Sequence, residues 1–121
     1  LIELKGPCDD IFEISTTSTF NGTSQEYNLH KKLARAIPQI LEYKSSLESK
    51  QAGDSELVAL GINERIKISK CIIVIGKNSD DTRWIQNKNN LANSLNSSLE
   101  VWTYSDLLNK VNTTIENIQN N

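Results

Sequence analysis

Cys71-Ile72-Ile73-Val74-Ile75 is the most apolar run of the sequence, and it decides the fold class. Lys70 and Gly76 bound it. The run is short and rich in β-branched residues, which favours a strand buried on both faces. Such a strand belongs in the middle of a sheet that helices cover.

The segments before this run predict a strand, a loop and a helix. Residues 1–5 alternate apolar and charged side chains until Gly6-Pro7 breaks the pattern, which predicts a strand. Residues 8–25 are rich in Thr and Ser and are expected to form a long loop. From about residue 24 apolar residues recur at helical spacing, and Pro38 is expected to kink or divide this helix. The apolar stripe consists of Leu29, Leu33, Ala36, Ile37, Ile40 and Leu47.

The segments after the run continue the alternation. Residues 56–60 predict a helical turn closed by Gly61, and Asp80-Asp81 opens a helix. Residues 99–103 predict a strand, and residues 103–106 resemble a capping box that starts a last helix. That helix carries an apolar face, made of Leu107, Leu108, Val111, Ile115 and Ile118. Alternating strands and helices indicate an α/β architecture with a mainly parallel or mixed sheet.

Composition and charge limit the possible functions but do not identify one. The 121 residues predict one domain, spanning residues 1–121, and no apolar segment predicts a membrane helix or a signal peptide. Cys8 and Cys71 have no metal-ligand spacing, so we expect reduced thiols and a cytoplasmic protein. A net charge of −2 does not indicate nucleic-acid binding, although a local basic patch could provide it.

Glu3 and Lys5 are the first candidates for chemistry. Residues i and i+2 of a strand project from the same face, so these side chains should stand side by side. A carboxylate can hold Mg²⁺, and a neighbouring ammonium can orient water or stabilise charge on a phosphate. The same pair on an edge strand that faces solvent would have no function, and that alternative stays open.

The predicted long helix carries the second set of candidates. Gln39 and Tyr43 are four residues apart and lie at one border of the apolar stripe, with Lys32 on the same edge. A border position lets a side chain reach sideways into a cleft. Gln offers a donor and an acceptor, Tyr a hydroxyl, and Lys a charge that attracts phosphate. Ordinary surface and boundary packing explains each residue equally well when it is taken alone.

Together these features resemble a known nuclease pattern. Glu3-Leu4-Lys5 on a strand, followed by a helix with Gln39 and Tyr43, is similar to the active-site pattern of PD-(D/E)XK nucleases. More narrowly, residues 2–7, 36–43, 70–77 and 101–108 resemble the nuclease domain of the Shedu family of bacterial antiphage defence proteins. The resemblance implies a restriction-endonuclease-like core with a mixed central sheet flanked by helices, lacking its N-terminal elements.

The resemblance also implies roles for individual residues. Glu3 would ligate Mg²⁺ or Mn²⁺ with the Leu4 carbonyl as a second ligand, Lys5 would be the catalytic lysine, and Gln39 would orient a ligand, water or phosphate. Lys32 and Tyr43 would contact the substrate. The implied activity is a metal-dependent DNA endonuclease that acts in antiphage defence and forms a homo-oligomer.

One departure from the family pattern concerns the metal site. The pattern needs a further acidic residue on a strand before Glu3, and neither of the two preceding residues is acidic. We expect that carboxylate to lie upstream of this chain. The chain by itself could then be inactive. The alternative is a nuclease-like module that binds only nucleic acid or a protein partner.

Other polar residues carry weaker expectations. Asp9 and Asp10 are typical of a polar loop, and His30 is expected to face solvent on the helix. Basic residues of the long helix could form a phosphate-contacting flank: Lys31, Lys32, Arg35 and Lys44. Gly76-Lys77-Asn78 lacks most of a phosphate-loop pattern, and Trp84 and Trp102 are expected in the core or at its boundary.

Overall fold

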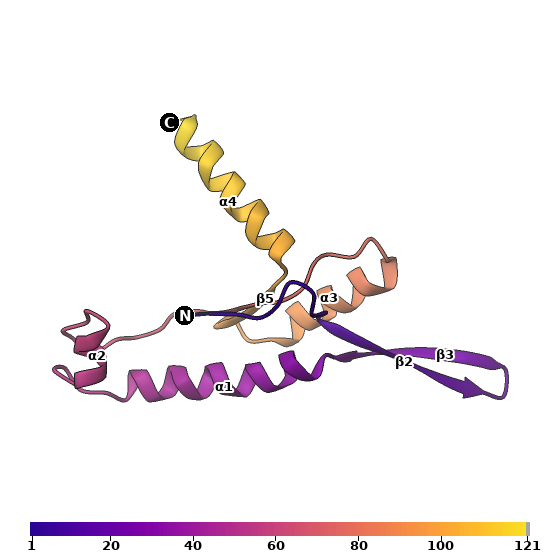
Figure 1. The fold of residues 1–121 in the computed structure, drawn as a ribbon, viewed down its shortest axis with the longest axis horizontal. Helices are drawn as coiled ribbons and strands as arrows, with labels where there is room; N and C mark the ends of the chain where they lie inside the picture. Colours follow the sequence, from indigo (N-terminus) through magenta and orange to yellow (C-terminus); the bar gives the residue numbers. More distant parts are fainter. Residues whose placement is uncertain (121) are drawn as a thin grey trace.

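A three-stranded parallel sheet lies at the centre of the computed structural model, which describes residues 1–120 (Figure 1). Strand β4 (Cys71–Val74) is the middle strand, with β1 (Ile2–Leu4) and β5 (Leu99–Trp102) at its sides. Both pairings are parallel, so the mixed sheet expected from the resemblance is not found in residues 1–120. The central position of the apolar run is confirmed.

Helices cover one face of this sheet and form the core with it. Helix α1 (Lys31–Glu48) and helix α3 (Thr82–Ser94) pack there, and both contribute buried side chains to the core. The β4 side chains Cys71 and Ile73 point toward them, and Ile75 beyond the strand does the same. The fully or nearly buried residues around them are Ile11, Phe12, Leu33, Ala36, Ile40, Trp84 and Leu99.

The prediction of a loop over residues 8–25 is wrong for most of this segment. β2 (Phe12–Thr19) and β3 (Gly22–Leu29) form an antiparallel hairpin that projects from the body of the molecule (Figure 1). The turn consists of two residues, Phe20 and Asn21, and Gly22 has a φ of 129°. Thr and Ser are common in loops, but a run of Thr also suits the pleated backbone of a strand.

Helix α1 therefore begins later than expected. Leu29 closes the hairpin opposite Phe12 and is not part of the helical stripe. His30 is the N-cap, and its ring nitrogen accepts a hydrogen bond from the backbone N–H of Lys32 at 3.1 Å. The expectation that His30 lies on the helix is thus wrong as well. A single helix runs through Pro38, so the expected division into two helices does not occur.

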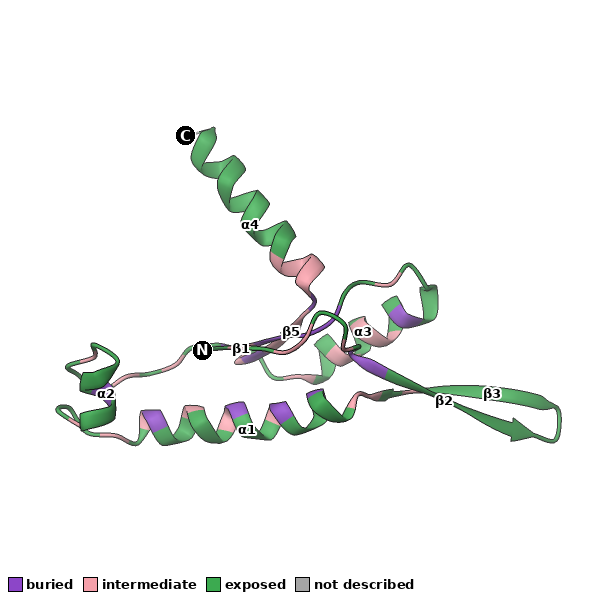
Figure 2. Ribbon diagram, viewed as in Figure 1, coloured by how far each residue is buried: buried purple, intermediate pink, exposed green. Residues whose placement is uncertain are grey.

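The remaining helices agree with the sequence pattern. α2 (Ser55–Ala59) is followed by Gly61 at a φ of 78°, and α3 is capped by the side chain of Asp81. α4 (Tyr104–Gln119) opens with the expected capping box between Thr103 and Asp106. Its apolar face, however, is not buried. No residue from Tyr104 to Gln119 is buried, and α4 is drawn as exposed beyond its first turn in Figure 2.

Two further features concern the cysteines and the helices. Cys8 is exposed, Cys71 is buried, and both thiols are free. Among the helices formed by residues 1–120, we find none with the length and apolar character needed to cross a membrane.

Candidate functional site

Glu3 and Lys5 stand next to each other on β1, as the strand pattern predicts. The Lys5 ammonium lies 3.2 Å from a carboxylate oxygen of Glu3, and both side chains are about one-third exposed or less, at 27% and 31%. β1 pairs with β4 on one side only, so the two residues sit at an open edge of the sheet. The ion pair is therefore partly accessible to solvent at this edge.

Helix α1 brings two more candidates to the same edge. Glu3, Gln39 and Tyr43 line one hollow of about 350 Å³, together with Leu1, Ile2 and Ile40. The alternation of β1 turns Glu3 toward α1, while Ile40 points into the core and leaves its neighbour Gln39 at the helix border. Strand β1 and helix α1 thus line the same hollow, and Lys5 is linked to it through its ion pair with Glu3.

The hydroxyl of Tyr43 is turned partly toward α2. It donates a long hydrogen bond of 3.5 Å to a carboxylate oxygen of Glu56. Glu56 is in turn paired with Lys50 at 3.1 Å. The Tyr43 ring thus forms a wall of the hollow while its polar end contacts neighbouring α2.

Lys32 does not reach this hollow. Its ammonium forms an ion pair with Asp9 at 2.9 Å, close to the start of α1. The hydrogen bond from Lys32 holds the pKa of the Asp9 carboxyl below its ordinary value, despite a smaller opposing effect of burial. The structure thus gives Lys32 a partner that the sequence did not suggest, and separates it from Glu3, Gln39 and Tyr43.

The basic flank expected on α1 is only partly free. Lys32 is bound to Asp9, and Lys44 pairs with Glu48 one helical turn away at 2.7 Å. Lys31 and Arg35 are exposed and have no ion pair within residues 1–120. These two side chains are the ones on α1 that remain available to contact phosphate groups.

The residues described here do not complete a metal site. No group of three or more His, Cys, Asp or Glu side chains within residues 1–120 could hold a metal ion. Glu3 supplies one carboxylate at the hollow. The Leu4 carbonyl faces the free edge, because Leu1 and Lys5 bond to β4 and successive residues of a strand point to alternate sides. One carboxylate and one carbonyl are fewer oxygen ligands than a hard cation needs.

A comparison with protein-family models decides the family. Residues 1–108 match the family model described as "Shedu protein SduA, C-terminal". The chain belongs to the Shedu family. The matched part contains β1 with Glu3 and Lys5, α1 with Gln39, and the first residues of α4. No curated protein matches the chain.

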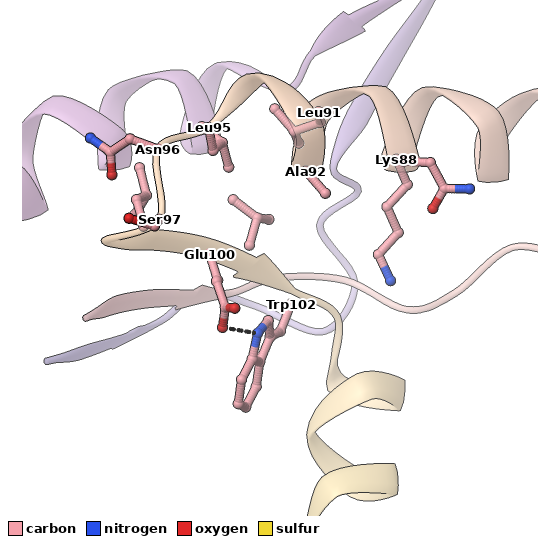
Figure 3. A pocket seen from close by; sticks show the side chains of 11 residues that line it. Lys88, Leu91, Ala92, Leu95, Asn96, Ser97, Glu100 and Trp102 are labelled. Carbon is pink, nitrogen blue, oxygen red and sulfur yellow. Dashed lines mark hydrogen bonds between the residues drawn. The ribbon is translucent and has the colours of Figure 1, made fainter. Parts of the chain in front are cut away.

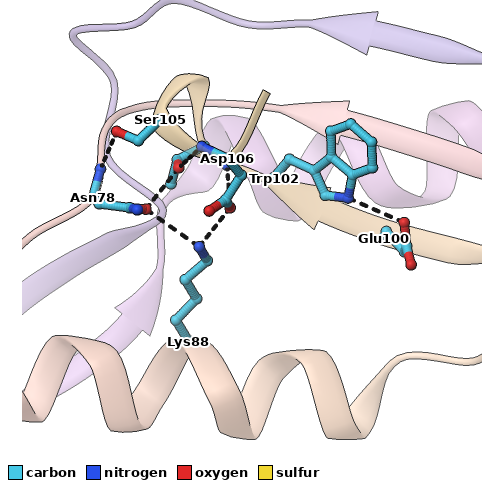
Figure 4. A network of polar contacts seen from close by, with 7 residues as sticks. Asn78, Lys88, Glu100, Trp102, Ser105 and Asp106 are labelled. Carbon is cyan, nitrogen blue, oxygen red and sulfur yellow. Dashed lines mark hydrogen bonds and ion pairs between the residues drawn. The ribbon is translucent and has the colours of Figure 1, made fainter. Parts of the chain in front are cut away.

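A polar network at the start of α4 organises the carboxyl end of the sheet in this Shedu domain (Figure 4). Lys88 of α3 donates to Asp106 at 2.5 Å and to the side-chain oxygen of Asn78 at 3.2 Å. The buried Thr103 hydroxyl donates to that same oxygen at 2.6 Å. The capping box could be found from the sequence, but its link to Lys88 could not, because no local spacing connects α3 with α4.

A second hollow, of about 290 Å³, lies between α3 and β5 (Figure 3). Its walls are mainly apolar and include Leu91, Leu95, Val101 and Trp102. The Trp102 indole N–H donates to Glu100 at 3.0 Å. None of the predicted site residues lines this hollow within the described chain, so the candidate chemistry of the Shedu domain stays at the β1 edge.

Proposed function

We propose that this chain contributes the strand-and-helix half of a metal-dependent DNA nuclease site in an antiphage defence protein of the Shedu family. The observation that carries the proposal is the meeting of Glu3 and Gln39 around one hollow, with Lys5 ion-paired to Glu3 at 3.2 Å. Membership of the family supports the defence role. DNA as the substrate and self-association of the chain belong to the same proposal.

Each residue has a task in this proposal that its position supports. The Lys5 ammonium lies beside the carboxylate of Glu3, so it can orient an attacking water or stabilise charge on the phosphate. Gln39 can donate to one oxygen and accept from another, which fixes the orientation of a water or phosphate in the hollow. Tyr43 lines the hollow, and in this proposal its side chain contacts the substrate.

Mg²⁺ or Mn²⁺ is the proposed cofactor, held by Glu3 and the Leu4 carbonyl together with a carboxylate that residues 1–120 do not provide. When bound, such an ion would stabilise the negative charge that develops on a phosphate during hydrolysis. An incomplete ligand set explains why this chain by itself need not cleave DNA. The intact protein is therefore the right material for a test.

Cleavage of supercoiled plasmid by the intact protein with Mg²⁺ tests the proposal. Lys5→Ala should lower the cleavage rate by at least about 100-fold, since a positioned group at the reacting centre contributes on that order. Lys67→Ala removes an equal charge from an exposed position that does not line the hollow and should change the rate only slightly. Unchanged cleavage by a folded Lys5→Ala protein would refute the assignment.

A binding module without catalysis is the second candidate, favoured by the missing carboxylate and by the net charge of −2. Titration calorimetry of the intact protein with Mn²⁺ separates the two. Metal binding that Glu3→Ala abolishes supports the nuclease. DNA binding without any metal binding supports the module.

A further inference from the structure

The hydroxyl of Tyr104 reaches the main chain of the lysine proposed to be catalytic. Tyr104 is the first residue of α4, and its hydroxyl donates a hydrogen bond to the carbonyl of Lys5, 99 positions earlier in the chain. Lys5 directly follows β1, and the contact between the two residues is partly buried. The last helix is therefore joined to the end of the strand that carries the candidate site.

The regular ladder of the sheet ends just before the Lys5 carbonyl. The Lys5 N–H donates to the Val74 carbonyl at 2.8 Å. If the parallel ladder continued, the Lys5 carbonyl would accept from the N–H two residues beyond Val74, which is that of Gly76. The Gly76 N–H donates instead to the Gly6 carbonyl at 3.2 Å. The Tyr104 hydroxyl thus takes the place of the next ladder donor, at a carbonyl whose loss of its partner would be costly.

The two contacts hold both peptide planes that meet at the Lys5 Cα atom. Because a peptide bond is planar, the hydrogen bond to Val74 fixes the plane that also contains the Leu4 carbonyl. The hydrogen bond from Tyr104 fixes the plane that follows Lys5. With both planes held, the backbone dihedral angles of Lys5 are set, and so is the direction in which its side chain leaves the strand. In this direction its ammonium lies 3.2 Å from Glu3.

The end of β1 depends on such an anchor. β1 is three residues long and pairs only with β4, at the edge of the sheet. Gly6 comes directly after Lys5, and glycine gives the backbone more freedom than any other residue. Segments with few packed neighbours are the first to open locally. Without the bond from Tyr104, we expect the strand to fray at Lys5.

Tyr104 can serve as the anchor because its own position is fixed by the first turn of α4. Its N–H donates to the Gly76 carbonyl at 2.9 Å. The preceding residue, Thr103, is fully buried and is the N-cap of the helix. Asp106 pairs with Lys88 of α3 at 2.5 Å. The start of α4 is therefore attached both to the segment after β4 and to α3.

We propose that Tyr104 is a positioning residue of the candidate site: its hydroxyl holds the Lys5 peptide and thereby keeps the Lys5 ammonium beside Glu3. In this role Tyr104 acts through Lys5 and makes no contact of its own with the substrate or a metal ion. The effect on catalysis rests on the proposed nuclease function, whereas the holding of the strand end rests on the hydrogen bonds of the fold. The two effects can be measured separately.

Hydrogen exchange of the intact protein, followed by mass spectrometry, tests the effect on the strand. Tyr104→Phe removes only the hydroxyl, and peptides from residues 1–7 should then exchange at least about 5-fold faster, because the end of β1 opens more often. Peptides from α1 should exchange as in wild type. Tyr27→Phe is the matched control, because it removes a hydroxyl that bonds to Asp81 at 3.4 Å, and it should leave residues 1–7 unchanged.

Two exchange results would overturn the proposal. Residues 1–7 of Tyr104→Phe could exchange at the wild-type rate, which would mean that the hydroxyl does not hold the strand end. Tyr104→Phe could also lose protection throughout residues 1–120, which would mean that the hydroxyl supports the whole fold and not the position of Lys5.

A double-mutant cycle of plasmid cleavage with Mg²⁺ tests the effect on catalysis. Tyr104→Phe should lower kcat about 10-fold and leave KM for DNA within about twofold, because a small displacement of Lys5 affects the reacting geometry more than binding. In a Lys5→Ala background the same substitution should have almost no further effect. Tyr27→Phe should leave kcat unchanged in both backgrounds. Losses that multiply in the cycle would overturn the proposal, since Tyr104 would then not act through Lys5.

Failure of the nuclease function would give a different result from failure of the positioning role. If the intact wild-type protein cleaves no plasmid, the proposed function is refuted, and the exchange of residues 1–7 still decides whether Tyr104 holds the strand end. If the wild type cleaves and the kcat of Tyr104→Phe stays within about twofold of it, the positioning role is refuted and the nuclease function stands.

Discussion

At the scale of single residues, Gly76 is where the end of β4 meets the segment after β1. Its φ is +69°, and a Cβ atom there would overlap the carbonyl oxygen of Asp9. We expect Gly76→Ala to lower the free energy of unfolding by about 2–4 kcal/mol, because backbone strain and a collision with the main chain add up.

Gly53→Ala is the matched control for this prediction. Gly53 also has a positive φ, of +87°, but no atom lies within 4 Å of the position that a Cβ would take. Only the backbone strain remains, with a cost of about 1 kcal/mol. Urea denaturation of both variants measures the difference. Equal losses of unfolding free energy in the two variants would mean that the close approach to Asp9 does not affect stability.

The candidate site residues show which positions local rules can predict. Glu3 and Lys5 were predictable as neighbours because strand alternation is a property of a few residues. Gln39 and Tyr43 were predictable as border residues because helical spacing is equally local. The partner of Lys32 was not predictable. Asp9 reaches it through a loop whose path depends on where the hairpin and α1 begin, and both were misplaced in the sequence-based interpretation.

At the scale of elements, β4 is the strand on which the core depends. Ile73 is fully buried between its neighbours, with 0% exposure. Ile73→Ala should lower the free energy of unfolding by about 3–4 kcal/mol, from lost burial and the cavity that remains.

Ile85→Ala makes the same chemical change at an exposed position on α3 and provides the comparison. We expect a loss below about 1 kcal/mol there, since little burial is removed. Thermal or urea unfolding monitored by circular dichroism gives both values. A loss at residue 73 no larger than at residue 85 would contradict the central position of β4.

The start of α4 should make stability depend on pH. Burial raises the pKa of the Asp106 carboxyl, but the Lys88 ammonium and the Thr103 N–H outweigh it and hold the pKa below the ordinary value. A lowered pKa in the folded state means that the ionised carboxylate adds stability above the unfolded pKa. That contribution is lost as pH falls through the folded pKa, which places the loss below about pH 4.

Asp106→Asn tests this contribution. At about pH 7 it should lower the free energy of unfolding by about 1 kcal/mol, the usual value of a helix cap with its favourable dipole contact. The difference from wild type should shrink as the pH approaches about 2.5. Glu116→Gln removes an exposed charge near the other end of α4 and should leave the pH profile unchanged. A constant difference at all pH values would refute the explanation.

The β2–β3 hairpin shows why an element can be missed although its signal is present. Asn21-Gly22, which overlaps the turn, is a hairpin signal, and β-branched residues such as Ile14 and Thr16 precede it. The Thr and Ser content suggested a loop instead. The strands β4 and β5 and the helices α3 and α4 were predictable because their apolar patterns are clear and their caps are local. Which face of the sheet the helices cover, in contrast, depends on long-range packing, and no short sequence pattern specifies it.

At the scale of the whole molecule, the hollow proposed as part of a nuclease site lies at one edge of the sheet, and the exposed helix α4 projects from the opposite side of the sheet. Glu3 and Gln39 occupy the side covered by α1, whereas Leu4 and α4 belong to the opposite side.

Plasmid cleavage by the intact protein carrying Glu3→Gln tests the central claim most directly. The substitution keeps the size and hydrogen-bonding capacity of the side chain but removes the charge proposed to hold a cation beside Lys5. Cleavage with Mg²⁺ should fall by at least about 100-fold while the melting temperature stays close to wild type. Glu64→Gln, an exposed position, should cleave normally. Cleavage by Glu3→Gln within about twofold of wild type would contradict the claim that this strand forms part of a nuclease site.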